Sequence, residues 1–181
     1  MKYQLVKIGN PVLRKKTRTV TRKQLVSKKF QVYLKQMVSQ MRKARGVGLA
    51  SNQLGFNNRA LVMECRGNKR YPKVKSFSLQ TYVNARIVKY SRSVEKGWEG
   101  CLSIPGFRGV VPRSQWVTFE AQTPDGRMVR KTIHGFEARV IQHEVDHLNG
   151  FFYMDRMKNL KTWMHLEEFN KHFGAGIKDN K

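Results

Sequence analysis

The chain has 181 residues, of which 40% are hydrophobic and 27% are charged, a composition typical of one globular domain rather than of a disordered chain. No run of about 18 apolar residues is present and the opening MKYQLVKIGN has no apolar signal core, so we expect a cytoplasmic protein with no membrane segment or membrane partner. Two cysteines, Cys65 and Cys101, are too few for a disulfide framework.

The charge of the chain is large and unevenly distributed. Lys and Arg number 36 against 12 Asp and Glu, a net charge of +24, and residues 1–63 hold 15 of the basic residues and no acidic one. Such a field attracts polyanions such as ribosomal RNA, DNA or anionic lipid, although a general basic bias that keeps the protein soluble would give the same composition.

Residues 24–44 are predicted to form an amphipathic helix that ends before Gly46. Apolar residues recur at three- and four-residue spacing, with Lys and Arg between them: Val26, Phe30, Tyr33, Leu34, Met37, Val38 and Met41. We expect this apolar stripe to face the core.

The middle of the chain changes to the period of β-strands. Four runs are rich in β-branched and aromatic residues: 59–65, 81–90, 116–122 and 127–133. The sequence TPDG at 123–126 predicts a tight turn between the last two, because proline presets its own φ and glycine accepts a positive φ.

A helical period returns at 136–148 and again in an amphipathic segment at 158–173. Helix, strands and then helices predict an α+β fold with antiparallel or mixed sheets rather than a βαβ fold. No linker interrupts the chain, so we expect one domain over residues 1–181.

The sequence HEVDH at 143–147 is the strongest local indication of chemistry. On a helix, His143 and His147 lie one turn apart on the same face, so both imidazoles can reach one metal ion. Glu144 follows the first histidine, where a general base can reach a water on the metal.

A catalytic site of this type needs a third protein ligand. Downstream, Glu167 or Glu168 could supply it, as in proteases with two histidines and one glutamate, whereas Tyr153 stands where the longer protease motif has its third histidine. Upstream, Cys101 lies in the sequence WEGCLSIPG, which we expect to form an irregular backbone from which its sulfur projects. A thiolate and two imidazoles suit a borderline-soft divalent ion.

A third segment, GVGLASNQLG at 46–55, lacks the spacing of a phosphate-binding loop. Its closely spaced glycines permit another backbone to approach. Gln53 offers a neutral N–H₂ donor, which suits a developing oxyanion or an ordinary structural role.

These segments together resemble the three signature motifs of peptide deformylases: GVGLASNQ, EGCLS and QHEVDHLNG, in this order and at this spacing. The similarity includes the opening GNPVLR at 9–14 and covers roughly residues 4–157. It implies an α+β fold built around a central metal-binding helix. It also implies hydrolysis of the N-formyl group from N-formylmethionine at the start of nascent polypeptides.

By position, the resemblance implies one metal ion held by Cys101, His143 and His147. Fe²⁺ is the ion it favours, although the donor set also suits Zn²⁺, Ni²⁺ or Co²⁺. Metal-bound water would attack the formyl carbon, with Glu144 as general base and then general acid.

The resemblance also assigns residues to the substrate. Gln53 and the Leu102 N–H would stabilise the oxyanion, and Arg108 would lie near the outer end of the peptide. Backbone groups of Val47, Gly48 and Gly100 would hold the substrate as an added strand. A deformylase must find nascent chains at the ribosome, so the basic excess predicts a weak, salt-sensitive ribosome association.

Three further residues have alternative roles. Glu99 and Asp146 could orient the imidazoles or be surface carboxylates. Arg139, four residues before His143, could pair with Glu99 or extend into solvent. The rival to an enzyme is an RNA-binding module whose metal site is structural, which would not need Glu144.

Overall fold

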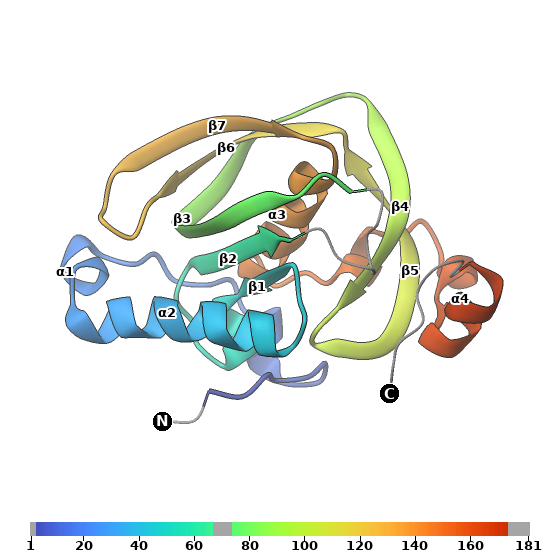
Figure 1. Ribbon diagram of the computed structural model, residues 1–181, viewed down its shortest axis with the longest axis horizontal. Coiled ribbons are helices and arrows are strands. Elements are labelled where there is room, and N and C mark those ends of the chain that lie inside the picture. The colour runs from blue at the N-terminus through green and yellow to red at the C-terminus, as the bar shows by residue number, and fades with distance from the viewer. Residues whose placement is uncertain (1–2, 67–73, 174–181) are drawn as a thin grey trace.

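The computed structural model describes residues 3–66 and 74–173. Within these residues the strands form two antiparallel sheets (Figure 1). The first sheet has the order β1-β2-β3-β6-β7, formed by Gly48–Ala50, Ala60–Cys65, Phe77–Tyr90, Trp116–Gln122 and Met128–His134. The second has the order β4-β5-β8, formed by Val94–Cys101, Ile104–Ser114 and Met164–His165. The α-helices are α1 (Arg22–Leu25), α2 (Lys28–Lys43), α3 (Gly135–Leu148) and α4 (Leu166–His172). The predicted α+β class is therefore correct, and every pairing between these named strands is antiparallel.

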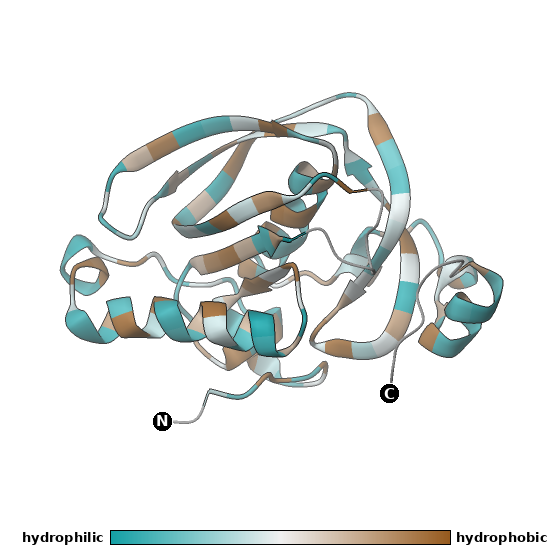
Figure 2. Cartoon of the chain, in the orientation of Figure 1, coloured by the Kyte–Doolittle hydropathy of each residue, from teal (hydrophilic) through white to brown (hydrophobic). Residues whose placement is uncertain are grey.

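Strand β2 shows how the core is divided. All six of its residues are buried, and it appears brown along most of its length in Figure 2. Because successive side chains of a strand point to opposite faces, Ala60 and Val62 pack with α2, whereas Leu61 and Met63 pack with α3. The first sheet is thus covered by a helix on each face.

Helix α3 lies between the first sheet and the β4–β5 hairpin (Figure 1). It follows β7 directly, with Gly135 at φ +58° making the turn from strand to helix. Its Ala138, Ile141 and Val145 enter the core against the first sheet, which leaves its opposite side toward the hairpin. No helix in the described ranges is long and apolar enough to cross a membrane.

The four predicted strands are present as β2, β3, β6 and β7, and the predicted turn joins the last two. Gly126 has φ +87° and its N–H donates to the Thr123 carbonyl oxygen at 2.9 Å. Strand β3 begins four residues earlier than predicted, at Phe77.

The single helix predicted at 24–44 is wrong, because the structure has two helices there. The Ser27 hydroxyl caps α2 by accepting a hydrogen bond from the Phe30 N–H at 3.3 Å. Val26 is predicted to belong to the apolar stripe, but it lies between the two helices and is 63% exposed. The stripe otherwise faces the core, where these residues of α2 are buried: Phe30, Tyr33, Leu34, Met37 and Met41.

The segment at 158–173 is also more irregular than predicted. Only Leu166–His172 forms an α-helix, and Met164–His165 pairs with Phe107 and Arg108 of β5. The Trp163 ring stacks on Phe107 with centroids 4.2 Å apart. This aromatic contact and the strand pairing take the place of a continuous helix.

Candidate metal centre and active site

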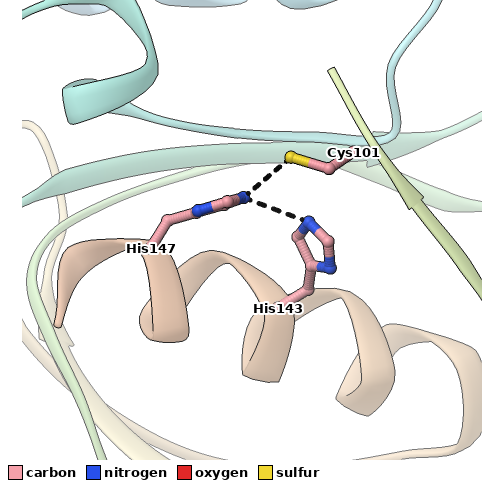
Figure 3. A group of neighbouring side chains, drawn as sticks. All are labelled: Cys101, His143 and His147. Carbon is pink, nitrogen blue, oxygen red and sulfur yellow. Dashed lines mark hydrogen bonds between the residues drawn. The ribbon is translucent and has the colours of Figure 1, made fainter. Parts of the chain in front are cut away.

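Three donor atoms from two elements meet beside α3 (Figure 3). Cys101 is the last residue of β4, and His143 and His147 lie one turn apart on α3. The His147 Nε2 is 3.1 Å from the Cys101 Sγ and 3.2 Å from the His143 Nε2. All three atoms lie within 4.8 Å of one another.

The donors fit a divalent metal ion of intermediate softness. His147 is fully buried, and burial followed by the charge of neighbouring His143 lowers its pKa well below the ordinary value. Its imidazole is therefore neutral, the form that binds metals. Burial opposes the charged form of His143, but hydrogen bonds with Cys101 and Glu99 outweigh it and raise the pKa of this residue.

Cys101 lies at the end of a strand, between a local irregularity and a turn, rather than within a wholly irregular segment, so the prediction of an irregular backbone is correct only in part. Strands β4 and β5 form a hairpin in which Cys101 pairs with Ile104, so Leu102 and Ser103 make a two-residue turn. A register shift between Glu99 and Cys101 is the one irregularity that the pairing shows here. The hairpin presents the cysteine sulfur at its tip.

Glu144 is buried beside the histidines. Burial raises its pKa to about 7, against the opposing influence of His143. A Cβ placed on Gly48 would lie 2.7 Å from the Glu144 Cδ, so only glycine leaves room for this carboxyl group. The Oε2 atom has no hydrogen-bond partner among the described residues. A carboxyl with these properties can gain or release a proton near neutral pH.

Gln53 is oriented by hydrogen bonds at both ends of its carboxamide. The Ala50 N–H donates to its Oε1 at 2.9 Å, and its Nε2 donates to the Ser103 Oγ at 3.2 Å and the Cys101 Sγ at 3.4 Å. The N–H₂ group therefore faces the cysteine. Ser103, within the motif EGCLS, is a partner that the sequence reasoning did not identify.

An open pocket of about 250 Å³ leads to this cluster. Its lining includes nine residues predicted for the site: Val47, Gly48, Gln53, Gly100, Cys101, Leu102, Arg108, His143 and Glu144. His147 lies behind them, fully buried. One edge strand of each sheet contributes to the pocket wall, β1 from the first sheet and β4 from the second.

The two carboxylates that could orient the imidazoles behave differently. Glu99 is buried, and its Oε2 lies 2.9 Å from the His143 Nδ1. Burial raises its pKa, but Arg113 outweighs this and keeps the pKa below the ordinary value. Asp146 instead pairs with Arg113 and Arg156, and among the described residues it makes no hydrogen bond or ion pair with either histidine ring.

Arg113 is a buried residue that the sequence reasoning missed. Its guanidinium holds Glu99 through two hydrogen bonds, at 2.9 and 3.0 Å, and also binds Asp146. Among 36 basic residues it carried no distinguishing local signal.

The two downstream glutamates do not join the histidines in a group of potential metal ligands among the described residues. Glu167 and Glu168 lie on α4 with side chains 78% and 50% exposed, next to His165, Lys171 and His172. Within residues 3–66 and 74–173, the group that could hold a metal is the one with Cys101.

An α+β fold with a thiol, two imidazoles and a buried glutamate at one pocket defines the class of metal-dependent hydrolases. Residues 2–163 match the family model described as polypeptide deformylase. The chain belongs to the peptide deformylase family, whose members are metal-dependent enzymes that remove the N-formyl group from nascent peptides.

Individual relatives agree with this assignment. The chain is 35% identical to peptide deformylase 2 of Nostoc sp. over 167 residues, 92% of each chain. It is 36% identical to peptide deformylase 1 of Xanthomonas campestris over 160 residues, 88% of this chain and 92% of the relative. A class I type b peptide deformylase of Acinetobacter baumannii, solved with Met-Ala-Ser bound, superposes with a TM-score of 0.84 at 34% identity, covering 87% of this chain and 99% of that one.

Proposed function

We propose that Cys101, His143 and His147 hold one divalent metal ion and that the pocket beside them hydrolyses N-formylmethionyl peptides. The observation that supports this proposal best is the convergence of these three donors with the buried Glu144 at one pocket. When bound, the ion supplies Lewis-acid chemistry, lowering the pKa of water and polarising the formyl carbonyl. Fe²⁺ is the proposed ion in the cell, with Zn²⁺, Ni²⁺ and Co²⁺ as ions that the same donors accept.

Glu144 moves the proton in the proposed reaction. It accepts a proton from the attacking water and then donates it to the nitrogen of the leaving amine, so formate and a free amino terminus result. Its burial and its pKa of about 7 support both roles, because such a group exchanges a proton readily at neutral pH.

Gln53 and the Leu102 N–H stabilise the negative charge that develops on the formyl oxygen. The Gln53 Nε2 lies 3.4 Å from the Cys101 Sγ and donates to the Ser103 Oγ, while the Ala50 N–H donates to the Gln53 Oε1, so the carboxamide needs little rearrangement during the reaction. One such donor typically contributes about 3–4 kcal/mol to lowering the barrier.

The peptide binds between the two edge strands. Val47 and Gly48 lie at β1 and Gly100 lies in β4, and edge strands present backbone groups that an extended peptide can pair with. Arg108 is buried, packs over Gly100 and lines the pocket, where we propose that it contacts the peptide's carbonyl or carboxylate groups. The tripeptide in the Acinetobacter structure supports a short peptide ligand.

The direct test is release of the free amine from formyl-Met-Ala-Ser by the metal-loaded protein, with acetyl-Met-Ala-Ser as the control. We expect turnover of the formyl peptide and little of the acetyl peptide. Equal rates, or turnover of neither, would contradict the proposed function. We also propose that the protein acts in the cytoplasm and that residues 1–181 form one domain; the family match over residues 2–163 supports one domain over most of that range.

We predict that protein purified in air loses activity and that reconstitution with Ni²⁺ or Co²⁺ gives a lasting active form. Iron at a thiolate site is sensitive to oxygen, and the Cys101 sulfur is oxidised once redox chemistry begins. The measurement is activity against time in air and under nitrogen for each metal. Full activity with zinc alone, unaffected by oxygen, would show that the proposed metal is wrong.

The basic excess gives a separate prediction, a weak association with ribosomes that weakens steeply as salt rises. Helices α1 and α2 expose seven lysines and arginines, of which Arg42 pairs with Glu64: Arg22, Lys23, Lys28, Lys29, Lys35, Arg42 and Lys43. Binding by cations to RNA phosphates falls with salt by a log–log slope of roughly 0.7–0.9 per phosphate neutralised. Co-sedimentation with ribosomes from about 50 to about 400 mM KCl measures this slope.

A triple charge reversal on α2, at Lys28, Lys29 and Lys35, should abolish the association without affecting peptide turnover. The matched control reverses three exposed charges elsewhere that, like those on α2, form no ion pair among the described residues, at Arg92, Lys96 and Lys131. Absence of binding at the lowest salt, or binding that ignores salt, would leave the basic excess without a role in locating substrate.

A further inference from the structure

Arg139 is the basic residue closest in sequence to the metal ligands on α3, one helical turn before His143. Its side chain is only 11% exposed and lines the pocket wall. The proposed reaction assigns it no role. Its contacts indicate one.

The Arg139 guanidinium binds the β4–β5 hairpin at four points. Its Nη2 donates to the Glu95 carbonyl oxygen at 2.8 Å, and its Nη1 to those of Val111 at 2.9 Å and Gly97 at 3.5 Å. Nη1 also donates to the Glu99 Oε1 at 2.9 Å. A rigid planar fork suits this set of acceptors, which a lysine ammonium could not span.

These contacts join the two elements that carry the metal donors. Cys101 is on β4 and the histidines are on α3. Among the described residues, no strand of the first sheet pairs with β4 or β5, and the hairpin joins that sheet only at its base, through residues 91–93 and Gln115. Away from that base, side-chain contacts help to fix the distance from the thiol to the imidazoles. Arg113 and Gln142 also link α3 to the hairpin, both through β5.

Arg139 differs from those two links because it lies on α3 and binds backbone carbonyl oxygens of β4, those of Glu95 and Gly97, as well as the Glu99 carboxylate. Glu99 accepts hydrogen bonds from Arg113 and Arg139, and its other oxygen lies 2.9 Å from the His143 Nδ1. Partners of a metal-bound histidine set its ring orientation and strongly affect metal affinity.

Gly97 is the counterpart of this arginine in the hairpin. A Cβ built on Gly97 would lie 2.9 Å from both the Cζ and the Nη2 of Arg139. The residue has no positive φ, so its backbone does not require glycine. The guanidinium occupies the space that a side chain would take.

We propose that Arg139 is a positioning residue that holds β4 against α3 and, through Glu99, orients His143 for the metal. This inference rests on the metal centre proposed above. Gly97 is part of the arrangement because its missing side chain admits the guanidinium.

The test compares the wild type with R139M, G97A, the double variant R139M/G97A, and the control R86M. Arg86 is a suitable control because it pairs with Glu120 on the surface of the first sheet and its side chain is 70% exposed. The readouts are the Co²⁺ dissociation constant from chelator competition and the thiolate-to-cobalt absorption. The melting temperature of the metal-free form is measured in parallel.

We expect R139M to weaken Co²⁺ binding by about 10–100-fold and to shift the cobalt absorption. G97A should act in the same direction by displacing the guanidinium, and should add nothing in the R139M background, where no guanidinium remains. R86M should bind as the wild type does. If R139M does not fold, G97A alone decides the outcome.

Two results would overturn the inference. One is a Co²⁺ dissociation constant for R139M or G97A within about 2-fold of that of the wild type, where a loss of about 10–100-fold is expected. This result would count against the inference even if the melting temperature falls. The other is a full independent effect of G97A in the double variant. If the wild type itself binds no Co²⁺, the proposed metal centre fails and this inference fails with it.

Discussion

Replacing Glu144 with glutamine is expected to lower kcat by at least about 100-fold while leaving the metal content unchanged. The amide has nearly the size of the carboxyl group, so it fits in the space beside Gly48, and the three proposed ligands remain. It cannot accept the proton of the attacking water. The measurements are kcat on formyl-Met-Ala-Ser and the metal content of the same preparation.

The matched control for this variant is Glu137→Gln, on the first turn of the same helix. Glu137 accepts a hydrogen bond from the Gln80 Nε2 at 2.5 Å and lies outside the pocket lining. It should keep activity close to that of the wild type. Near-normal turnover by E144Q would show that another group carries the proton.

Replacing Cys101 with alanine is expected to remove the bound metal and, with it, the activity. The variant keeps two imidazoles but loses the thiolate, the softest of the three donors, and its remaining donors come from a single helix. Metal content after dialysis and formyl-peptide turnover are measured together. Activity should fall to that of the metal-free wild type.

Cys65→Ala provides the control, since Cys65 is the other cysteine and is buried in β2, away from the pocket. Burial raises the pKa of its thiol, which keeps it protonated and unreactive. This variant should retain metal and activity. Full metal content in C101A would instead require a different third ligand, such as Glu167 or Glu168.

The contacts of Glu99 with Arg113, Arg139 and His143 support the proposed metal centre for a physical reason. The Glu99 carboxylate, which Arg113 and Arg139 both bind, stays ionised although it is buried, because Arg113 and the contact with His143 offset its desolvation. Its contact with the His143 Nδ1 leaves Nε2 directed at the other donors. Glu99 therefore contacts the proposed metal centre through the His143 ring.

Local sequence patterns determined much of the fold. Strand β6 spans the predicted residues 116–122, and α3 begins one residue before the predicted 136 and ends at the predicted 148. The histidines at 143 and 147 share a face because the helical period requires it. These features depend on neighbours within a few residues, so alternation, turn residues and helical spacing were sufficient to predict them.

Local signals also existed where the prediction failed. Thr21 and Gln24 form a capping box for α1, and Ser27 caps α2, but the continuous apolar period of 24–44 concealed the break. The cap was visible in the sequence. The sequence did not show that this cap, rather than the apolar period, decides where the long helix begins.

The tertiary structure alone decided the rest. The residues of β4 and β5 around Cys101 gave no clear alternation, and they form strands because each is the other's partner across a hairpin. The C-terminal segment leaves its helical period where Trp163 stacks on Phe107 and β8 pairs with β5. Arg113 and Arg139 acquire their roles only when β5, β4 and α3 come together. Contacts between residues tens of positions apart depend on the free energy of the whole packed arrangement, which no local pattern encodes.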